Sequence, residues 1–117
     1  MKRKRIISYF KSYFDDFYSA QTRKVQDKIN WTIELIEFAE VIPEKYFKHL
    51  TGTDGLYEMR VQHGSNIFRI FCFFDRGNII VIGHGFQKKT DKTPKKELER
   101  AEKIKQAYYE ENASYLL

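Results

Sequence analysis

The chain has 117 residues, a net charge of +5 and a pI of about 9.3, and this length predicts a single domain spanning residues 1–117. Aromatic residues make up 16% of the chain, which excludes a disordered protein because such chains lack the apolar surface to form a core. No apolar run approaches the roughly 20 residues that cross a bilayer, and the apolar part of the basic N-terminus is too short for a signal peptide. We therefore expect a soluble, cytoplasmic protein with no membrane partner. The positive charge favours a polyanionic partner, nucleic acid first.

Cysteine usage and motif content narrow the possible chemistry. Cys72 is the only cysteine, which excludes a disulfide framework and a Cys-based zinc site within the chain. It lies in an apolar run, so we expect a small buried hydrophobic residue and not a nucleophile. The sequence contains no P-loop, no Rossmann glycine pattern and no metal-ligand spacing. We therefore expect neither a metal site nor a cofactor.

The N-terminal part is expected to cover one face of a sheet. Residues Lys4 to Phe10 are rich in β-branched and aromatic side chains and predict an edge or outer strand. Tyr13 to Tyr18 predicts a short helix. From Arg23 to about Ala39, the spacing of apolar residues predicts a longer helix with a wide apolar face, and Ser19 or Thr22 is suited to cap it.

Two further expectations concern the region around this longer helix. Trp31 lies toward the flank of its apolar face and is expected to pack against the rest of the protein. Pro43 ends the helix because proline disfavours helical geometry in the residue before it. Beyond it, Glu44 to Leu50 is expected to form one more helical turn.

The middle of the chain predicts three consecutive strands. Leu56 to Gln62 alternates, with Tyr57, Met59 and Val61 on one face and Leu56, Glu58 and Arg60 on the other. Two further apolar strands are expected at Ile67 to Phe74 and Ile79 to Phe86. The segments HGSN at 63–66 and DRGN at 75–78 predict hairpin turns, so the three strands form an antiparallel meander.

The C-terminal part predicts a Lys-rich loop and a helix. The loop covers Gln87 to Thr93, and Thr93-Pro94 is typical of the N-cap and first position of a helix. Residues 110–117 are expected to be a flexible tail. The apolar stripe of the helix comprises Leu98, Ala101, Ile104 and Tyr108, and the other faces hold acidic and basic residues, including Lys105.

The strongest candidates for chemistry are two arginines on the predicted sheet. Arg69 interrupts the most apolar strand, where an unpaired buried charge costs several kcal/mol. It therefore either pairs with an acid such as Glu58 or opens into a groove and binds an anion. Arg60 lies on the neighbouring strand and can approach Arg69 across the hairpin. Two guanidinium groups in this arrangement suit a phosphate.

Further candidates follow on the third strand and the loop after it. Lys88 and Lys89 follow the strand and form either a solvated loop or part of a binding edge. His84 is either a structural residue or a group that transfers protons near neutral pH. Phe86 is either a core residue or a stacking platform for a base. If the substrate is RNA, its 2′-OH can attack the adjacent phosphate without a metal, and nearby cations would lower the pKa of a lysine so that it can move protons.

The segments GLYEMRV, NIFRIFCFFDRGNIIVIGHGF and QKKTDKTPKKELERAEKIK resemble the HigB-like, phage-associated branch of the RelE/ParE toxin superfamily. The resemblance covers nearly the whole chain. It implies an α+β fold in which an N-terminal strand and helices pack on a small twisted antiparallel sheet, with a C-terminal helix. It also implies the toxin of a type II toxin–antitoxin system. Its partners would be a cognate antitoxin, of helix-turn-helix, HigA-like type, together with the ribosome and mRNA.

In the RelE and HigB branch the resemblance implies a ribosome-dependent endoribonuclease that cleaves mRNA. By position, Arg60, Arg69, Lys88 and Lys89 match basic residues of the family, and together with His84 they are the candidate catalytic residues. The candidate substrate-binding residues are Phe86, Lys92, Lys95 and Lys96.

The identity of the general acid and base stays open. RelE uses a tyrosine in its C-terminal segment, where this chain has Thr93-Pro94, and Glu58 stands where RelE has a second lysine. His84 is a possible substitute. Two other functions share the fold: a ParE-like inhibitor of DNA gyrase, and a non-catalytic nucleic-acid-binding relative. Retention of both arginines and of the lysine pair favours the nuclease.

Overall fold

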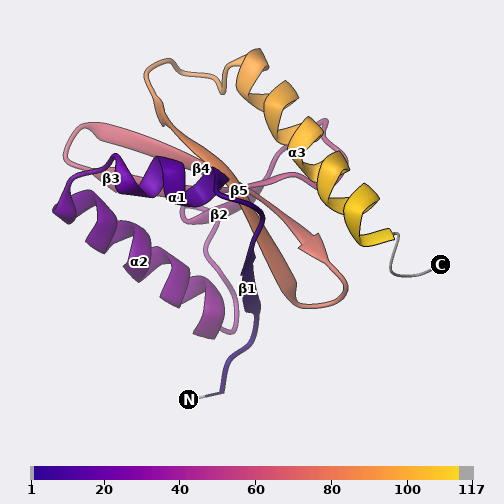
Figure 1. Ribbon diagram of the computed structural model, residues 1–117. Helices are drawn as coiled ribbons and strands as arrows, with labels where there is room; N and C mark the ends of the chain where they lie inside the picture. The colour runs from indigo at the N-terminus through magenta and orange to yellow at the C-terminus, as the bar shows by residue number, and fades with distance from the viewer. Residues whose placement is uncertain (1, 114–117) are drawn as a thin grey trace.

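The computed structural model describes residues 2–113 and contains five strands and three helices around one sheet (Figure 1). None of the described helices is long and apolar enough to cross a membrane. In chain order the elements are β1 (Ile6–Tyr9), α1 (Tyr13–Ser19), α2 (Arg23–Phe38), β2 (Phe47–His49), β3 (Tyr57–His63), β4 (Asn66–Asp75), β5 (Ile79–Lys88) and α3 (Lys95–Ala113).

The strands form a mixed sheet in the order β1-β5-β4-β3-β2. The antiparallel meander of β3, β4 and β5 is confirmed, as is the α+β class. The predicted N-terminal edge strand is also confirmed, but it pairs with β5 in parallel, in register Ile6 to Ile79. The sheet is therefore not wholly antiparallel. A parallel pair needs a long connection, and here the chain between β1 and β5 includes every other strand.

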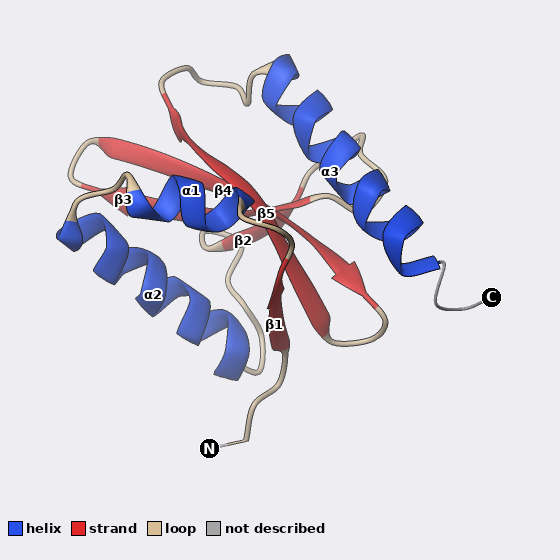
Figure 2. Ribbon diagram, in the orientation of Figure 1, coloured by secondary structure: helices blue, strands red, loops and turns tan. Residues whose placement is uncertain are grey.

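Helices cover both faces of the sheet (Figure 2). On one face, α1 and α2 pack over a core that includes Ile29, Met59 and Ile70. On the other, α3 packs over Phe71, Phe73 and Val81. This division follows the alternation of side chains along the strands, and it confirms the two faces expected for β3.

The long helix α2 begins and ends close to the predicted residues. The Thr22 hydroxyl caps it by accepting a hydrogen bond from the Val25 N–H at 3.4 Å. Thr32, which is fully buried, donates its hydroxyl to the Lys28 carbonyl one turn earlier. Trp31 packs on the Tyr46 ring in a T-shaped arrangement, 5.3 Å between centroids, but its side chain remains 49% exposed.

The helical turn expected at Glu44 to Leu50 is wrong, because this segment contains β2. Phe47 pairs with Met59 of β3, and its ring stacks on Tyr57 at 5.0 Å between centroids. This short strand is specified by its partner strand and not by its own sequence pattern.

The two predicted hairpin turns are confirmed. Gly64 and Ser65 connect β3 to β4, with φ of 61° at Gly64 only, as in a type II′ turn. In the second turn Gly77 also has a positive φ, of 59°, which favours glycine.

A bulge in β5 determines which of its side chains face α3. Ile82 pairs with Cys72 and Gly85 with Ile70, so Gly83 and His84 together lie opposite one residue of β4. An extra residue shifts the alternation, and it places His84 on the α3 face, where its ring contacts Phe71. β5 also extends two residues beyond the predicted end, so Lys88 belongs to the strand and not to the loop.

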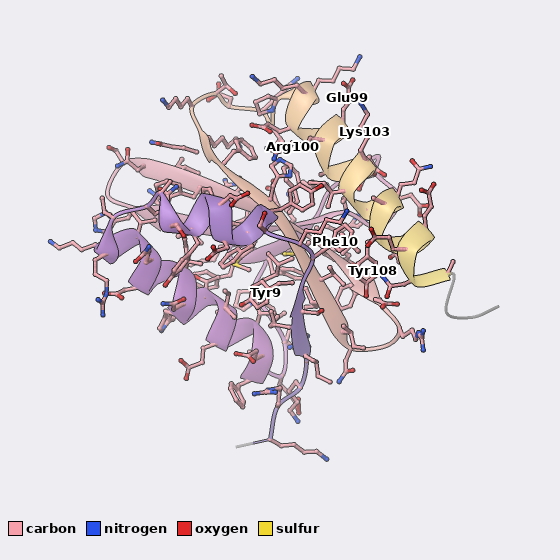
Figure 3. The ribbon with its side chains drawn as sticks, viewed as in Figure 1. Tyr9, Phe10, Glu99, Arg100, Lys103 and Tyr108 are labelled. Atoms are coloured by element: carbon pink, nitrogen blue, oxygen red, sulfur yellow. The ribbon has the colours of Figure 1, made fainter. Side chains whose placement is uncertain are left out.

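The C-terminal helix packs by its predicted apolar stripe. The Tyr108 ring meets the edge of Phe10 at 5.3 Å between centroids (Figure 3), and its hydroxyl donates to Asp75. Lys105, which was expected outside the apolar stripe, is buried: it is 8% exposed, and its ammonium group donates to the Asp54 carbonyl. The expected tail at 110–117 is also wrong in part, since α3 runs to Ala113, and residues 114–117 lie outside the described residues.

The packing of α1 on β5 gives a prediction about Gly85. A Cβ atom built on Gly85 lies 2.7 Å from the Phe17 ring. We expect Gly85→Ala to lower the free energy of unfolding by about 1–3 kcal/mol, measured by urea denaturation, because the ring and the helix must shift. Gly83→Ala is the matched control, since its Cβ meets its nearest neighbours at 3.6 Å. Equal losses in the two variants would contradict this packing.

Candidate active site

The candidate site lies on the α3 face of the sheet, where three neighbouring strands carry polar residues. Glu58 and Arg60 project from β3, Arg69 from β4, and Phe86 and Lys88 from β5. Arg60 and Arg69 are directly opposed in the β3–β4 register, as expected from the hairpin. The register also pairs Arg69 with Phe86, so the sheet itself brings these side chains together.

Glu58 is the acid that organises this group. Its side chain is only 3% exposed, and its Oε1 atom lies 3.2 Å from Arg60 Nε and 3.3 Å from Arg69 Nε. Its other oxygen, Oε2, accepts a hydrogen bond from the Thr93 hydroxyl at 3.4 Å. One buried carboxylate therefore holds both arginines and also the loop that leads into α3.

This contact explains why Thr93 does not cap α3 as predicted. The helix begins at Lys95, and the Pro94 carbonyl accepts the first backbone bonds, from Glu97 and Leu98. The Thr93 hydroxyl is instead directed to Glu58. The Thr-Pro pair thus ties the start of the helix to the site.

Arg69 pairs with Glu58 and also lines a hollow. The ion pair and the open groove, which were alternatives on the sequence alone, therefore occur together. Burial lowers the pKa of Arg69 and the Arg60 charge lowers it further, whereas Glu58 raises it. The guanidinium stays charged at neutral pH because its ordinary pKa is far higher. Its Nη1 donates to the Phe68 carbonyl at 3.1 Å. Its Nε lies 3.3 Å from Glu58 Oε1, but the two atoms are not aligned for a hydrogen bond. Nε therefore has no hydrogen-bond partner among the described residues. The arginine therefore keeps unused donor capacity.

The hollow in front of the arginines has a volume of about 600 Å³ and a basic lining. No acidic residue is among the lining residues, because Glu58 lies behind the arginines. The lining comprises Lys28, Lys45, Tyr46, Arg60, Val61, Gln62, Gly64 and Arg69. Such a surface favours a bound anion.

Lys88 joins the arginines from the third strand. Partial burial lowers its pKa below the usual lysine value, and the nearby Arg69 charge lowers it further. Both effects favour the neutral amine. Phe86, two residues earlier, is partly buried and stacks on Phe71 at 5.7 Å between centroids, so its ring forms a part of the wall beside Lys88.

Lys88 does not line the hollow, and neither do the four remaining predicted lysines. They are exposed on the loop after β5 and on the first turn of α3, and among them only Lys95 has an ion pair in the described part of the chain, at 3.9 Å from Glu99. These residues are Lys89, Lys92, Lys95 and Lys96. These lysines add positive charge to the surface next to the site.

His84 has a different environment from the other predicted catalytic residues. It is 2% exposed, and its Nε2 lies 3.2 Å from Glu97 Oε1 of α3. Its Nδ1 has no hydrogen-bond partner in residues 2–113. Burial lowers the pKa of His84 and the charge of Arg100 lowers it further, while Glu97 raises it. The imidazole thus connects β5 to α3 beneath Phe71 and does not line the hollow.

Sequence reasoning missed Lys28, Lys45 and Tyr46, which line the hollow. It also missed the contact between the Thr93 hydroxyl and Glu58. Lys28 was assigned only to a helix, and Lys45 and Tyr46 to a helical turn that is absent. The missing signal was the pairing of β2 with β3, which brings the Tyr46 carbonyl to the Arg60 N–H at 2.8 Å. Among residues 2–113 no group of three or more His, Cys, Asp or Glu side chains is placed to hold a metal ion.

Residues 16–106 match the family described as phage derived protein Gp49-like (DUF891). The chain belongs to the Gp49-like family. This family is one of the RelE/ParE-like toxin families. The matched segment includes all of the site residues, from Lys28 to Lys96. No match was found among curated proteins.

The burial of His84 predicts a pH-dependent stability of this Gp49-like protein. Because the pKa of His84 is lower in the folded state than in the unfolded state, the unfolded chain takes up the proton first as the pH falls through about 6.5. The free energy of unfolding should therefore decrease between pH 7 and pH 5, by at most about 1.4 kcal/mol per pH unit from this group. Urea denaturation at several pH values measures this slope.

His84→Gln should remove this part of the slope, and His63→Gln, at an exposed histidine of β3, should leave it unchanged. Identical pH slopes in the wild type and in His84→Gln would show that His84 is not held neutral by the fold.

Proposed function

We propose that this Gp49-like protein is the toxin of a type II toxin–antitoxin system, of the HigB-like branch, and that it cleaves mRNA on the ribosome without a metal ion. The observation that carries the proposal is the pair of arginines held by one buried carboxylate, with Lys88 on the same face of the sheet. Membership of a RelE/ParE-like toxin family supports the biological role.

The reaction begins when the 2′-oxygen of a ribonucleotide attacks the adjacent phosphorus. The P–O5′ bond breaks, and the products are a 2′,3′-cyclic phosphate and a 5′-hydroxyl. One proton leaves the 2′-OH and one is given to the leaving 5′-oxygen. Charge accumulates on the non-bridging oxygens, and arginine donors near that charge lower the barrier. Arg60 and Arg69 both line the hollow and supply such donors.

Lys88 is the group that we assign to proton transfer. Proton transfer is most efficient when the pKa of the group lies near the working pH, and the pKa of Lys88 is lowered by burial and by Arg69. In this scheme His84 supports the site through Glu97 and the first turn of α3. Lys89, Lys92, Lys95 and Lys96 contribute positive charge to RNA binding, and Phe86 contributes a ring beside the scissile nucleotide.

The proposal includes a cognate antitoxin of helix-turn-helix, HigA-like type that inhibits the toxin. A basic hollow with no acidic residue in its lining is suited to be covered by an acidic segment of such a partner. Inhibition of the nuclease by that segment would then be competitive with RNA.

The experiment is a translation reaction in which the ends of a reporter mRNA are mapped. We expect ribosome-dependent cleavage that yields 2′,3′-cyclic phosphate and 5′-hydroxyl ends, which are the products of attack by the 2′-oxygen. Arg69→Lys keeps a positive charge beside Glu58 but loses the guanidinium fork, and it should slow cleavage by about 100-fold or more. Lys103→Ala, an exposed change on α3 (Figure 3), is the control and should cleave normally.

A second variant tests the proton-transfer role. Lys88→Arg preserves the charge but cannot lose a proton near neutral pH, so it should retain RNA binding and lose cleavage. If the wild type leaves translated mRNA intact, the nuclease proposal is wrong. Gyrase-dependent DNA breaks in that case would support the ParE-like alternative.

A further inference from the structure

The open edge of β3 carries a second group of side chains that the proposed reaction does not use. β2 pairs only with Tyr57 to Met59, whereas β3 continues to His63. Beyond the end of β2 the Arg60 N–H is taken by the Tyr46 carbonyl, at 2.8 Å. The basic hollow extends over this edge, since Val61, Gln62 and Gly64 are part of its lining.

Two lysines reach this edge from separate elements. Lys28 comes from α2 and Lys45 from the segment before β2, and both line the same hollow as Arg60 and Arg69. Both lysines are exposed, and neither makes an ion pair within residues 2–113. Surface lysines usually gain little from ion pairs, but here they add charge to a hollow that already contains two arginines.

Two aromatic rings accompany these lysines. Tyr46 lines the hollow, and Trp31 packs edge-on against it at 5.3 Å between centroids. Lys45 Nζ lies 5.0 Å from the centre of the Tyr46 ring, and Lys28 Nζ lies 5.7 Å from the Trp31 ring. Trp31 is 49% exposed, which leaves a large ring surface in water although its apolar area would favour burial.

Aromatic rings beside lysines in one groove are the combination by which many proteins bind single-stranded nucleic acid. Bases stack on exposed aromatic rings, and lysines along the same groove neutralise the phosphates. An acidic peptide would use the lysines but would gain little from the exposed Trp31 ring and the partly buried Tyr46 ring. The rings therefore favour a nucleotide over a peptide.

We propose that Lys28, Trp31, Lys45 and Tyr46, here called the edge site, bind the nucleotide next to the scissile phosphate of the RNA. The two lysines hold its phosphate, and its base stacks on the Tyr46 ring, against which Trp31 packs at an interplanar angle of 69°. The RNA strand thus crosses the open edge of β3 from the arginines to α2. This inference rests on the proposed function, because it takes the arginine pair as the position of the scissile phosphate.

Trp31 is the only tryptophan of the chain, so its fluorescence reports on the edge site directly. The experiment titrates the whole protein with a 2′-O-methyl RNA hexamer, which cannot be cleaved. We expect quenching of Trp31 as the oligonucleotide binds. Tyr46→Ala should weaken binding by about 5- to 100-fold because the base loses a ring on which to stack. The double variant Lys28→Ala/Lys45→Ala should also make RNA binding less sensitive to salt. The slope of log K against log[salt] should become shallower by about 0.7 for each phosphate that is no longer neutralised.

The matched control is Lys2→Ala/Lys103→Ala, which removes the same charge from exposed positions outside the hollow. It should leave the quenching and the salt slope close to wild type. Equal weakening by both double variants would show that only net charge matters, and it would overturn the edge site. Absence of quenching at saturating RNA would overturn it as well.

The outcome is separate from that of the cleavage reaction. If RNA quenches Trp31 but mRNA is never cleaved, the edge site is supported as an RNA-binding site and the nuclease proposal fails. If mRNA is cleaved and the Lys28→Ala/Lys45→Ala and Tyr46→Ala variants bind and cleave like the wild type, only the edge site is overturned.

Discussion

The arrangement of the whole site depends on one buried carboxylate. Glu58 lies between the core and two arginines on neighbouring strands, and its second oxygen holds Thr93 before α3. Removing charges from water costs several kcal/mol for each ion, and only close pairing offsets this cost. With Glu58 in place, two guanidinium groups that would otherwise repel each other are held side by side. Two arginines against one acid leave an excess positive charge, and that charge faces the hollow.

The surrounding core makes this arrangement rigid. Phe71 and Phe86 stack beside the site, and His84 joins β5 to α3 through Glu97. The bulge in β5 is necessary for this, because without the extra residue His84 would face α1 and α2. Preorganised donors are more effective than mobile ones because they need no reorganisation when charge develops. The same apolar packing that stabilises the fold thus fixes the distances on which the proposed chemistry depends.

Sequence reasoning predicted the meander, the long helix α2 and the opposition of Arg60 and Arg69, because alternation and tight turns determine strand register locally. It missed β2 and predicted a helical turn there, because three residues are too few to show a period-2 pattern and form a strand only against β3. The burial of Lys105 also could not be predicted, because besides Glu102 on its own helix it contacts a backbone carbonyl 51 residues away. For the site, the arginines and Lys88 were recognised, whereas Lys28, Lys45 and Tyr46 are brought in by tertiary contacts alone.

The most direct test of the central claim is a double-mutant cycle between Glu58 and Arg69, measured by urea denaturation. Glu58→Gln leaves the buried Arg69 and the partly buried Arg60 without their acid, and Arg69→Met removes one of these charges. If the carboxylate holds the arginines, Glu58→Gln should destabilise the protein more in the wild-type background than in the Arg69→Met background, with a coupling energy of about 2 kcal/mol. Additive effects, within about 0.5 kcal/mol, would contradict the claim that this ion pair organises the site.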